Sequence, residues 1–330
     1  MKVAHLAVIT PNRCGLYETT RELVTGLRHI GVDSRLVDPA PRKDVIEPDH
    51  QDRGAPYASM EWAQDADILV NHSGFDNTPL EKAQKPVIHI CHGRPRNSFL
   101  SELGGSTPIF SYHYGKNKDP RFKAVVTFWP EHVDYHKVMF PDKPVYYVQA
   151  PADLSAWTIE GPKGYGFHGK RGRVNLVLTD PFRDDVDAFI PLHAAALFAR
   201  EVEGTKIHIF GSRYDKKKGF SALLRRIQDD GNLGEIQGWV GGLAHVYRAA
   251  TAMVTANEIA TRSYREAIAC GCPVVRVRSL ADDWRVEMRK ALHMKLEDRK
   301  LLAMQAKAMF NPAVTAKQFL KVIEETTCSG

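Results

Sequence analysis

The sequence has few of the features that mark secreted, membrane-spanning or disordered proteins. Five cysteines among 330 residues make an odd number, and with no recognisable export signal this argues against a disulfide framework. The first apolar run, which ends at Pro11, is about six residues long and too short for a signal peptide or a membrane span. We therefore interpret it as a buried strand and expect a cytoplasmic protein without a transmembrane segment.

The composition is that of an ordinary globular protein. Hydrophobic residues make up 43% and charged residues 25% of the chain, and the sequence contains no low-complexity tract and no repeat of solenoid period. Because 330 residues exceed the usual size of one compact core, we expect two domains of roughly 150 residues each. The net charge of +6 suits a nucleoside diphosphate ligand but serves solubility equally well.

Short runs rich in Val and Ile alternate with amphipathic segments, a pattern typical of parallel sheets covered by helices on both faces. In the first half we predict a helix at 17–30 and strands at 3–10, 34–38, 66–72, 86–92, 108–113, 124–129 and 144–151. In the second half we predict strands at 174–180, 206–212, 236–240, 252–256 and 273–277. Helices are expected at 186–200, at 220–229, through Tyr247, up to Cys270, at 282–293, at 297–309 and after Pro312.

The Gly-rich and basic segment 158–173 is the best candidate for a linker. It separates an N-terminal domain, 1–157, from a C-terminal domain, 174–310, and we expect the last helix, 311–330, to pack back toward the N-terminal domain. Two doubly wound domains in tandem would place their ligand sites at the carboxyl ends of the strands, toward a shared crevice. This architecture hosts many chemistries, so function must be argued from the site residues.

The segment 236–275 carries the most specific pattern. A Gly-x-Val turn at 238–240 is followed by Tyr-x-x-Ala at 247–250, a strand, Glu258, Glu266-Ala267 and Gly-x-Pro-Val-Val at 271–275. In this order and spacing the segment resembles the donor-binding signature of the retaining GT-B glycosyltransferases, in particular glycosyltransferase family 4. The resemblance implies an α/β protein of the GT-B fold class, in which two Rossmann-like domains face each other across a cleft.

Two acidic residues of this segment are the central candidates for donor binding. Glu258 follows a predicted strand, and a helix that begins near residues 261–263 would present unpaired backbone amides to a diphosphate. The resemblance implies that Glu258 contacts the donor sugar, that Glu266 binds the ribose, and that the amides near Arg262 and Ser263 hold the diphosphate. Two alternatives remain open: Glu266 closes a capping box with Ser263, and Glu258 is a solvated loop carboxylate.

The N-terminal half offers two further matches to the same family. Gly15, before a predicted helix, occupies the position where a family glycine lets the backbone approach the donor phosphates, although Cys14 replaces the usual second glycine. His92, at the end of a predicted strand, matches a histidine that reaches the donor sugar or the reacting centre. The alternatives are an ordinary tight turn for Gly15 and a packed histidine for His92, while His89 is expected in the core.

The sequence departs from the family at the diphosphate cations. The family has an Arg and, about five residues later, a Lys after the first strand of the second domain. This chain has Arg183, followed by Asp184 and Asp185. Help could come from the segment after Gly211, which contains Arg213 and Lys216, Lys217 and Lys218, unless these are only a solvated loop. We expect no metal and no cofactor, with the nucleotide sugar acting as co-substrate.

The resemblance implies transfer of a hexose from a UDP-glucose-type donor to an acceptor hydroxyl with retention of configuration, with His92, Arg183 and Glu258 at the reacting centre. The acceptor stays open between DNA and a glycan. Basic and aromatic residues are interleaved over 85–123, among them Arg94 and Arg96, which suits a virus-type enzyme that glycosylates a hydroxymethylated DNA base. A non-catalytic sugar-nucleotide-binding or glycan-binding protein is the remaining alternative.

Overall fold

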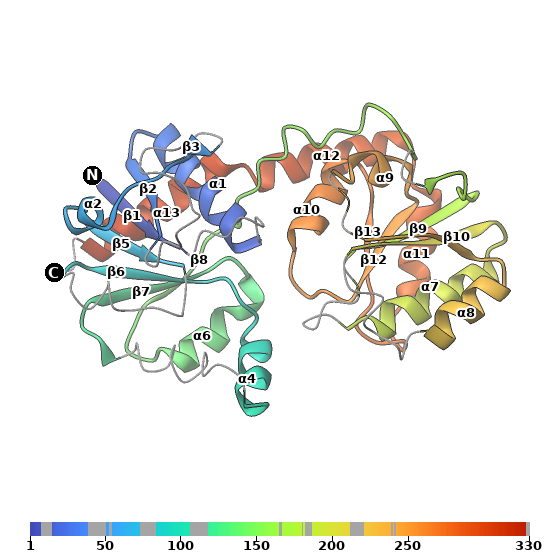
Figure 1. Ribbon diagram of the computed structural model, residues 1–330, viewed down its shortest axis with the longest axis horizontal. Coiled ribbons are helices and arrows are strands. Elements are labelled where there is room, and N and C mark those ends of the chain that lie inside the picture. Colours follow the sequence, from blue (N-terminus) through green and yellow to red (C-terminus); the bar gives the residue numbers. More distant parts are fainter. Residues whose placement is uncertain are drawn as a thin grey trace. The chain divides into compact units, whose positions relative to one another are not determined.

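The computed structural model describes residues 1–7, 15–38, 51–52, 55–72, 84–105, 118–164, 167–179, 181, 187–211, 221–238, 240 and 242–327. The chain divides into two compact units (Figure 1). The first unit contains Met1–Asp153 and Met309–Gly330, and the second contains Leu154–Ala308. Among the described helices, none combines the length and the hydropathy that a membrane span requires.

The first unit is built on a six-stranded parallel sheet with the strand order β2-β1-β5-β6-β7-β8. The strands are β1 (Lys2–Leu6), β2 (Asp33–Val37), β5 (Ile68–Asn71), β6 (Val87–Cys91), β7 (Phe122–Thr127) and β8 (Val145–Tyr147). Every residue of β5 and β6 is buried, as expected for central strands that are covered on both faces. The smaller elements are β3 (Gln51–Asp52), β4 (Ala55–Pro56), α2 (Met60–Gln64), α4 (Pro95–Leu103), η2 (Pro130–His132) and α6 (Val133–Met139).

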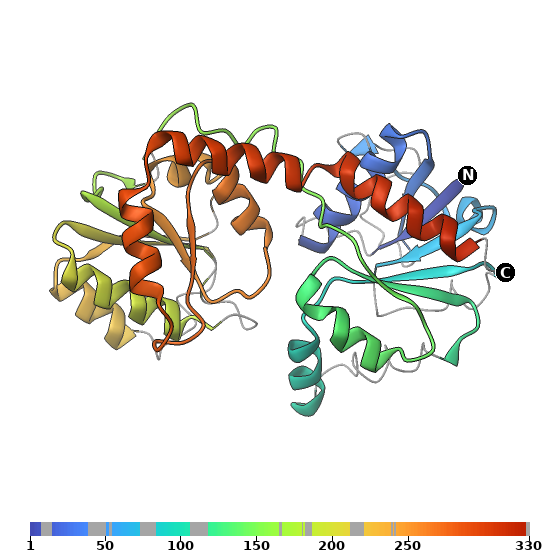
Figure 2. The ribbon, with the colours of Figure 1, turned by 180° about the vertical axis from the view of Figure 1, so that it is seen from behind.

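Two helices from opposite ends of the chain pack together on this sheet. They are α1 (Gly15–His29) and α13 (Pro312–Thr327), and α13 runs beside α1 in Figures 1 and 2. The rings of Phe319 on α13 and His5 on β1 lie 6.2 Å apart, so α13 also contacts the sheet. A Cβ atom on Gly26 of α1 would lie 2.5 Å from the Pro312 carbonyl oxygen, which makes this helix contact a backbone-to-backbone approach.

The second unit is built on a five-stranded parallel sheet with the order β11-β10-β9-β12-β13. Its strands are β9 (Val174–Thr179), β10 (Thr205–Phe210), β11 (Leu233–Gln237), β12 (Ala252–Thr255) and β13 (Val274–Arg276). Its helices are α7 (Phe189–Glu201), α8 (Ser221–Asp229), α9 (Ala244–Ala249), α10 (Arg262–Ala269), α11 (Trp284–His293) and α12 (Leu296–Met309). Leu176, Leu192, Phe198, Ile207 and Val254 are buried in its largest core cluster.

The predicted strands and helices of both halves are confirmed where the structure describes them, with one shift in position. The strand predicted at 236–240 is β11, Leu233–Gln237, three residues earlier. The start of β11 was misplaced because the strand contains Gly234, and a glycine inside a strand normally indicates weak strand propensity. Here a Cβ atom would lie 2.6 Å from the His208 ring, so only glycine fits without a shift of its neighbour.

Two further expectations concern the strand at 108–113 and the linker at 158–173. The strand expected at 108–113 lies outside the described residues. The described part of the segment 158–173, interpreted as a linker, belongs to the second unit. Arg248 donates from Nε to the Thr158 carbonyl at 2.7 Å, and the Gly164 amide donates to the His245 carbonyl at 2.8 Å. These bonds tie the segment to the region of α9.

Candidate functional site

The second sheet reverses its strand order between β9 and β12. From β9 the chain proceeds outward to β10 and β11, and then returns to the other side of β9 as β12 and β13. In open parallel sheets, ligands bind outside the carboxyl ends of the strands at such a reversal. Thr179 and Thr255 end the two strands here. The segment that follows Thr255 contains Glu258 and leads into α10, so Glu258 and the candidates on α10 follow a strand of the reversal point.

Glu258 is partly buried in the loop between β12 and α10. The loop is held at both ends. The Asn257 amide donates to Thr255 Oγ1 at 3.1 Å, and Arg276 Nη1, at the end of β13, donates to the Glu258 carbonyl at 3.1 Å. The Arg276 guanidinium also lies over the Tyr264 ring, 4.7 Å from its centroid. Arg276 therefore connects the loop, the last strand and α10, a role that the sequence pattern did not indicate.

The first turn of α10 is capped by Thr261. Its side chain accepts a hydrogen bond from the Tyr264 amide at 3.4 Å, and its backbone is extended, with φ −54° and ψ 170°. The helix begins at Arg262, within the predicted range. The alternative in which Ser263 and Glu266 form a capping box is wrong, because the cap lies two residues earlier and Ser263 is already inside the helix. Glu266 is one turn further on, so a role other than capping explains its position better.

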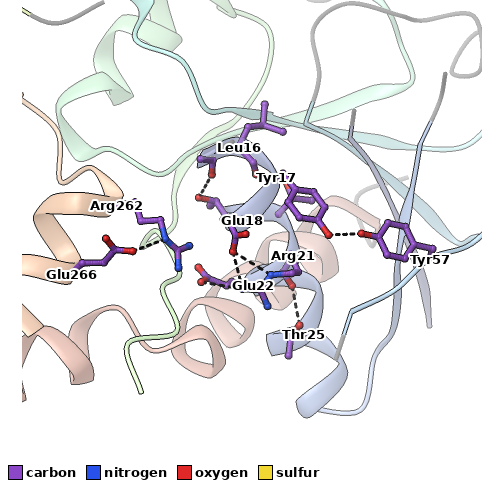
Figure 3. Close-up of polar contacts among 12 residues, drawn as sticks. Leu16, Tyr17, Glu18, Arg21, Glu22, Thr25, Tyr57, Arg262 and Glu266 are labelled. Atoms are coloured by element: carbon purple, nitrogen blue, oxygen red, sulfur yellow. Dashed lines mark hydrogen bonds and ion pairs between the residues drawn. The ribbon is translucent and has the colours of Figure 1, made fainter. Parts of the chain in front are cut away.

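Glu266 pairs with Arg262 across one turn of α10. Arg262 Nε lies 2.8 Å from Glu266 Oε1, and the exposed fractions of the two side chains are 27% and 13% (Figure 3). Since a carboxylate has about four acceptor sites, this ion pair is compatible with further hydrogen bonds from ligand hydroxyls. The Arg262 cation also lies at the first turn of α10, where backbone amides already favour anions.

Tyr247 on α9 lies within the electrostatic influence of Glu266. The tyrosine is fully buried on α9, and its pKa is raised well above the ordinary value, first by burial and then by the negative charge of Glu266. No structural description covers Arg183, Arg213, Lys216, Lys217 and Lys218, which all lie outside the described residues. Which of these cations takes the place of the lysine found in glycosyltransferase family 4 is therefore an expectation from the sequence alone.

Gly211 follows β10 at the same edge of the second sheet. Its amide donates to the carbonyls of Gln237 at 3.0 Å and Gly238 at 3.1 Å, which closes the end of β10 against the end of β11. Its φ is +132°, a backbone conformation that side chains other than glycine rarely adopt. Gly211 follows β10, and Glu258 and the first turn of α10 follow β12, so they belong to the same carboxyl edge of one sheet, with β9 between the two strands.

The first sheet reverses its strand order between β1 and β5. Gly15, the first residue of α1, follows β1 in the chain, and among the described residues, apart from its chain neighbours and its own helix backbone, no atom lies within 4 Å of a Cβ atom built on it. Its carbonyl accepts a hydrogen bond from Thr19 Oγ1 at 2.8 Å. Farther along α1, Arg21 pairs with Glu18 at 3.0 Å and with Glu22 at 3.4 Å, and all three charged side chains are buried (Figure 3).

His92 follows β6, the strand next to β5, and is partly buried. Its Nε2 atom lies 2.7 Å from Nδ1 of the buried His72, and His72 Nε2 lies 2.8 Å from Nδ1 of the buried His5. Sequence reasoning missed His5 and His72. The signal was present, because His5 is in β1 and the other two follow β5 and β6, and neighbouring parallel strands bring such positions to one edge. His89 is buried, as expected.

The basic and aromatic residues of 85–123 lie in different environments. Arg94 precedes α4 and is partly buried, and Arg96 in the first turn of α4 is exposed. Phe99 is exposed, but Phe122 is a core residue of the sheet and Arg121 is paired with Asp119 at 2.7 Å. The remaining members of that basic and aromatic set are Lys85, Lys118 and Lys123, which are described, and Phe110, Tyr112, Tyr114 and Lys116, which lie outside the described residues.

No protein-family model matches the sequence, and no curated protein matches it either. Similar solved structures were found. HepE from Anabaena, in complex with UDP and glucose, is 11% identical with a TM-score of 0.70 over 98% of this chain and 100% of that chain. Sucrose-phosphate synthase from Thermosynechococcus elongatus is 12% identical with a TM-score of 0.72 over 100% of both chains. The catalytic domain of starch synthase IV from Arabidopsis thaliana, bound to ADP and acarbose, is 11% identical with a TM-score of 0.63 over 98% and 99%.

The chain has the GT-B fold. The similarity extends over the whole length of the chain and of these structures, and each GT-B half has the Rossmann-like parallel sheet described above. At 11% to 12% identity the likeness concerns the fold alone. The activity of this GT-B protein must therefore be argued from the residues at the strand ends.

Proposed function

We propose that the chain is a retaining glycosyltransferase of the family 4 type, which transfers a hexose from a nucleotide sugar such as UDP-glucose to an acceptor hydroxyl. One observation carries the proposal: Glu258 and the capped first turn of α10 follow β12 at the reversal point of the second sheet. This arrangement agrees with the donor-binding order that the sequence resembles. The full-length GT-B likeness to proteins crystallised with UDP and glucose or with ADP supports the same conclusion.

In this proposal each element of the second unit has a stated role. The backbone amides of Arg262 and Ser263 hold the diphosphate, because the first amides of a helix have no partner within the helix. Glu266 accepts the ribose hydroxyls, and Arg262 keeps its carboxylate charged and oriented through the 2.8 Å pair. Glu258 accepts a hydroxyl of the donor sugar. Gly211 lets the chain pass the phosphates without a side chain.

Catalysis would rest on stabilisation of the negative charge that develops on the departing diphosphate. The α10 amides supply part of it, and we propose Arg183 and Arg213 as the cations. From the other half, His92 would reach the donor sugar and Gly15 would approach the phosphates. We assign no general base, because retaining enzymes of this type lack an evident protein nucleophile at the sugar carbon. Independence of metal ions and of cofactors stays a prediction, as does a cytoplasmic location.

The acceptor stays open between a glycan and a hydroxymethylated DNA base. Arg94 and Arg96 are the residues we propose on the acceptor side. No contact in the described part of the chain favours one acceptor over the other, because Phe122 of the interleaved set is a core residue and Arg121 is already paired. A panel of both acceptor classes is therefore part of the test, and a protein that only binds the nucleotide sugar is one of its outcomes.

The first experiment measures donor binding by thermal shift with UDP-glucose and other nucleotide sugars. A ligand at a hundred times its dissociation constant stabilises the fold by about 2.7 kcal/mol. Loss of two hydrogen bonds from ribose in Glu266→Ala should weaken binding about a hundredfold, because each is worth about 1.5 kcal/mol. At the same ligand concentration the stabilisation then falls to about 0.4 kcal/mol.

Glu287→Gln is the matched control, since Glu287 is an exposed acidic residue of α11 that also pairs with a basic residue one turn away, Lys290 at 2.7 Å. It should leave the ligand shift unchanged. An unchanged shift in Glu266→Ala would contradict the ribose assignment. Release of UDP is then measured with glycan acceptors and with DNA that contains hydroxymethylated bases. Binding without release for any donor and acceptor would identify a binding protein and refute the transferase.

A further inference from the structure

Three histidines form a hydrogen-bonded row across the first sheet. His5 lies in β1, His72 follows β5 and His92 follows β6, and these strands are neighbours in the sheet (Figure 1). The contacts are His5 Nδ1 to His72 Nε2 at 2.8 Å and His72 Nδ1 to His92 Nε2 at 2.7 Å. The exposed fractions of His5 and His72 are 0% and 3%. The row therefore connects the core of the unit with the partly exposed His92.

Thr20 on α1 sets the direction of this row. Its hydroxyl donates its single proton to the Leu16 carbonyl at 2.9 Å, and its Oγ1 also lies 3.0 Å from His72 Nδ1. With the proton committed, Oγ1 can only accept at the second contact. His72 Nδ1 must then carry the proton and donate it, shared between Thr20 Oγ1 and His92 Nε2. This assignment follows from the hydrogen-bond network, as tautomers do whenever hydrogens are inferred.

The other end of the row agrees with this direction. If His72 is protonated on Nδ1, its Nε2 accepts a hydrogen bond from the Nδ1–H of His5. His5 Nε2 is then unprotonated and carries only a lone pair. His5 Nε2 is buried and has no hydrogen-bond partner in the described part of the chain. The reverse direction would bury an unpaired N–H there, and buried N–H groups without a partner are rarer than incompletely satisfied acceptors. Both ends of the row thus support the same proton placement.

The buried rings of His5 and His72 are neutral, and the spacing of the row fits direct hydrogen bonds. Burial lowers the pKa of His5 to about 3, and burial followed by the nearby His92, His5 and His89 lowers the pKa of His72 well below the ordinary value. Two nitrogens bound to one zinc ion at about 2.0 Å lie about 3.3 Å apart. The contacts of 2.7 and 2.8 Å are shorter and fit direct hydrogen bonds.

We propose that His5 and His72 are positioning residues that hold His92 as the Nδ1-protonated tautomer, in which Nδ1 is a hydrogen-bond donor and not a base. The consequence for catalysis rests on the proposed function, in which His92 contacts the donor sugar. A donor at this position would bind a sugar hydroxyl oxygen and orient the ring. The rings of His92 and Phe128 meet at an interplanar angle of 70°, with centroids 5.2 Å apart, so Phe128 also packs against the His92 ring.

The tautomers can be measured without any assay of activity. The nitrogen chemical shifts of protein labelled with ¹⁵N in the histidine rings, at pH 8, distinguish a protonated from an unprotonated ring nitrogen. The signals of His92 are assigned by comparison with His92→Gln. His208 is an internal reference of the opposite kind, because its Nδ1 accepts from the Glu235 amide at 3.0 Å and its Nε2 lies 3.1 Å from the Asn175 side-chain oxygen. We expect His208 protonated on Nε2 and His92 on Nδ1.

Two substitutions of His72 test the cause. In His72→Asn the side-chain amide can still donate from the former Nδ1 position, so His92 should remain protonated on Nδ1. In His72→Leu no donor is left, and His92 should relax to a mixture of tautomers. A wild-type His92 protonated on Nε2 would overturn the proposal, and so would an unchanged spectrum in His72→Leu. If the leucine variant fails to fold, the wild-type and asparagine spectra still decide.

The activity of the same variants separates this proposal from the proposed function. If the protein transfers sugar, kcat/KM should fall about tenfold in His72→Leu, equal to about 1.4 kcal/mol, and recover to within about threefold in His72→Asn. An equal loss in both variants would contradict the positioning role. Absence of turnover in the wild type with every donor would refute the transferase, whereas the tautomer of His92 would still support or overturn the row by itself.

Discussion

Two glycines of α1 allow one substitution to be tested in two opposite environments. A Cβ atom on Gly26 would lie 2.5 Å from the Pro312 carbonyl oxygen, 2.9 Å from its carbonyl carbon and 3.2 Å from the Ala316 Cβ. A Cβ atom on Gly15 would meet no atom within 4 Å from any other part of the described chain, its own helix backbone aside. Glycine to alanine changes helix propensity in the same direction at both sites, so the difference between the variants reports the packing of α13 on α1.

The expected magnitudes follow from two opposing effects. Alanine is favoured over glycine inside a helix by about 0.8 to 1 kcal/mol, whereas forcing an extra carbon into a packed contact costs about 1 to 3 kcal/mol. At Gly26 the obstacle is backbone, which cannot rotate away, so we expect a net loss of about 1 kcal/mol. For a unit of this size that corresponds to a Tm lower by about 2 to 4 °C. Gly15→Ala should keep or slightly raise the Tm of the free protein.

Thermal unfolding with and without UDP-glucose measures both effects. Gly26→Ala should lower the Tm of the free protein, and its ligand shift should be that of the wild type. Gly15→Ala should behave in the opposite way, with an intact fold and a reduced ligand shift, if the backbone at Gly15 approaches the donor phosphates. A Gly26→Ala protein that is more stable than the wild type would refute the close approach of α13 to α1.

Three further predictions concern the second unit. Arg299 on α12 donates to the carbonyls of Ala250, Thr251 and Gly271 at 3.1, 3.2 and 3.3 Å. Arg299→Met should therefore lower the free energy of unfolding, measured in urea, by about 3 kcal/mol. Arg299→Lys should restore only part of the lost stability. Burial, followed by the charges of Lys206 and Lys170, lowers the pKa of His208 to about 4, so the unfolded chain binds the extra proton between pH 6.5 and 4. From pH 7 to pH 5 the wild type should therefore lose about 2 kcal/mol more stability than His208→Gln. Thr261→Ala should cost about 1 kcal/mol of stability through loss of the α10 cap and should weaken UDP-glucose binding measured by titration calorimetry, whereas Thr261→Ser should do neither.

The sheets could be predicted from sequence because their central strands are mostly apolar. β9 and β6 are continuous buried runs between turn signals, which is the pattern of a strand covered on both faces. β11 could not be placed correctly, since its Gly234 is explained only by the His208 ring of the neighbouring strand. When the identity of a residue is set by a contact across the sheet, the residues next to it in sequence do not reveal the reason.

The candidate site also contains residues that could be predicted from the sequence and residues that could not. Glu258 and the start of α10 were predictable because the strand, the loop and the helix are consecutive in sequence. Arg276 was not, because its bond to the Glu258 carbonyl joins residues 18 positions apart and its stacking partner, Tyr264, lies on another element. The capping alternative for Glu266 failed for a local reason: Thr261 also had the right chemistry for a cap, and short motifs cannot decide between two such residues two positions apart.

The role of His92 cannot be fixed from its own position in the sequence, because it depends on the side chains next to it in the fold. His92 alone, at the end of a strand, suits a base, a hydrogen-bond donor or a packed ring. His72 removes the first role, because its Nδ1 proton occupies His92 Nε2, and that proton is placed by a threonine hydroxyl of α1 whose own proton goes to Leu16. The chemistry that a strand end can offer is therefore set by a helix that covers the sheet. A change in α1, such as Thr20→Val, should alter the protonation of the row while it leaves all three histidines in place.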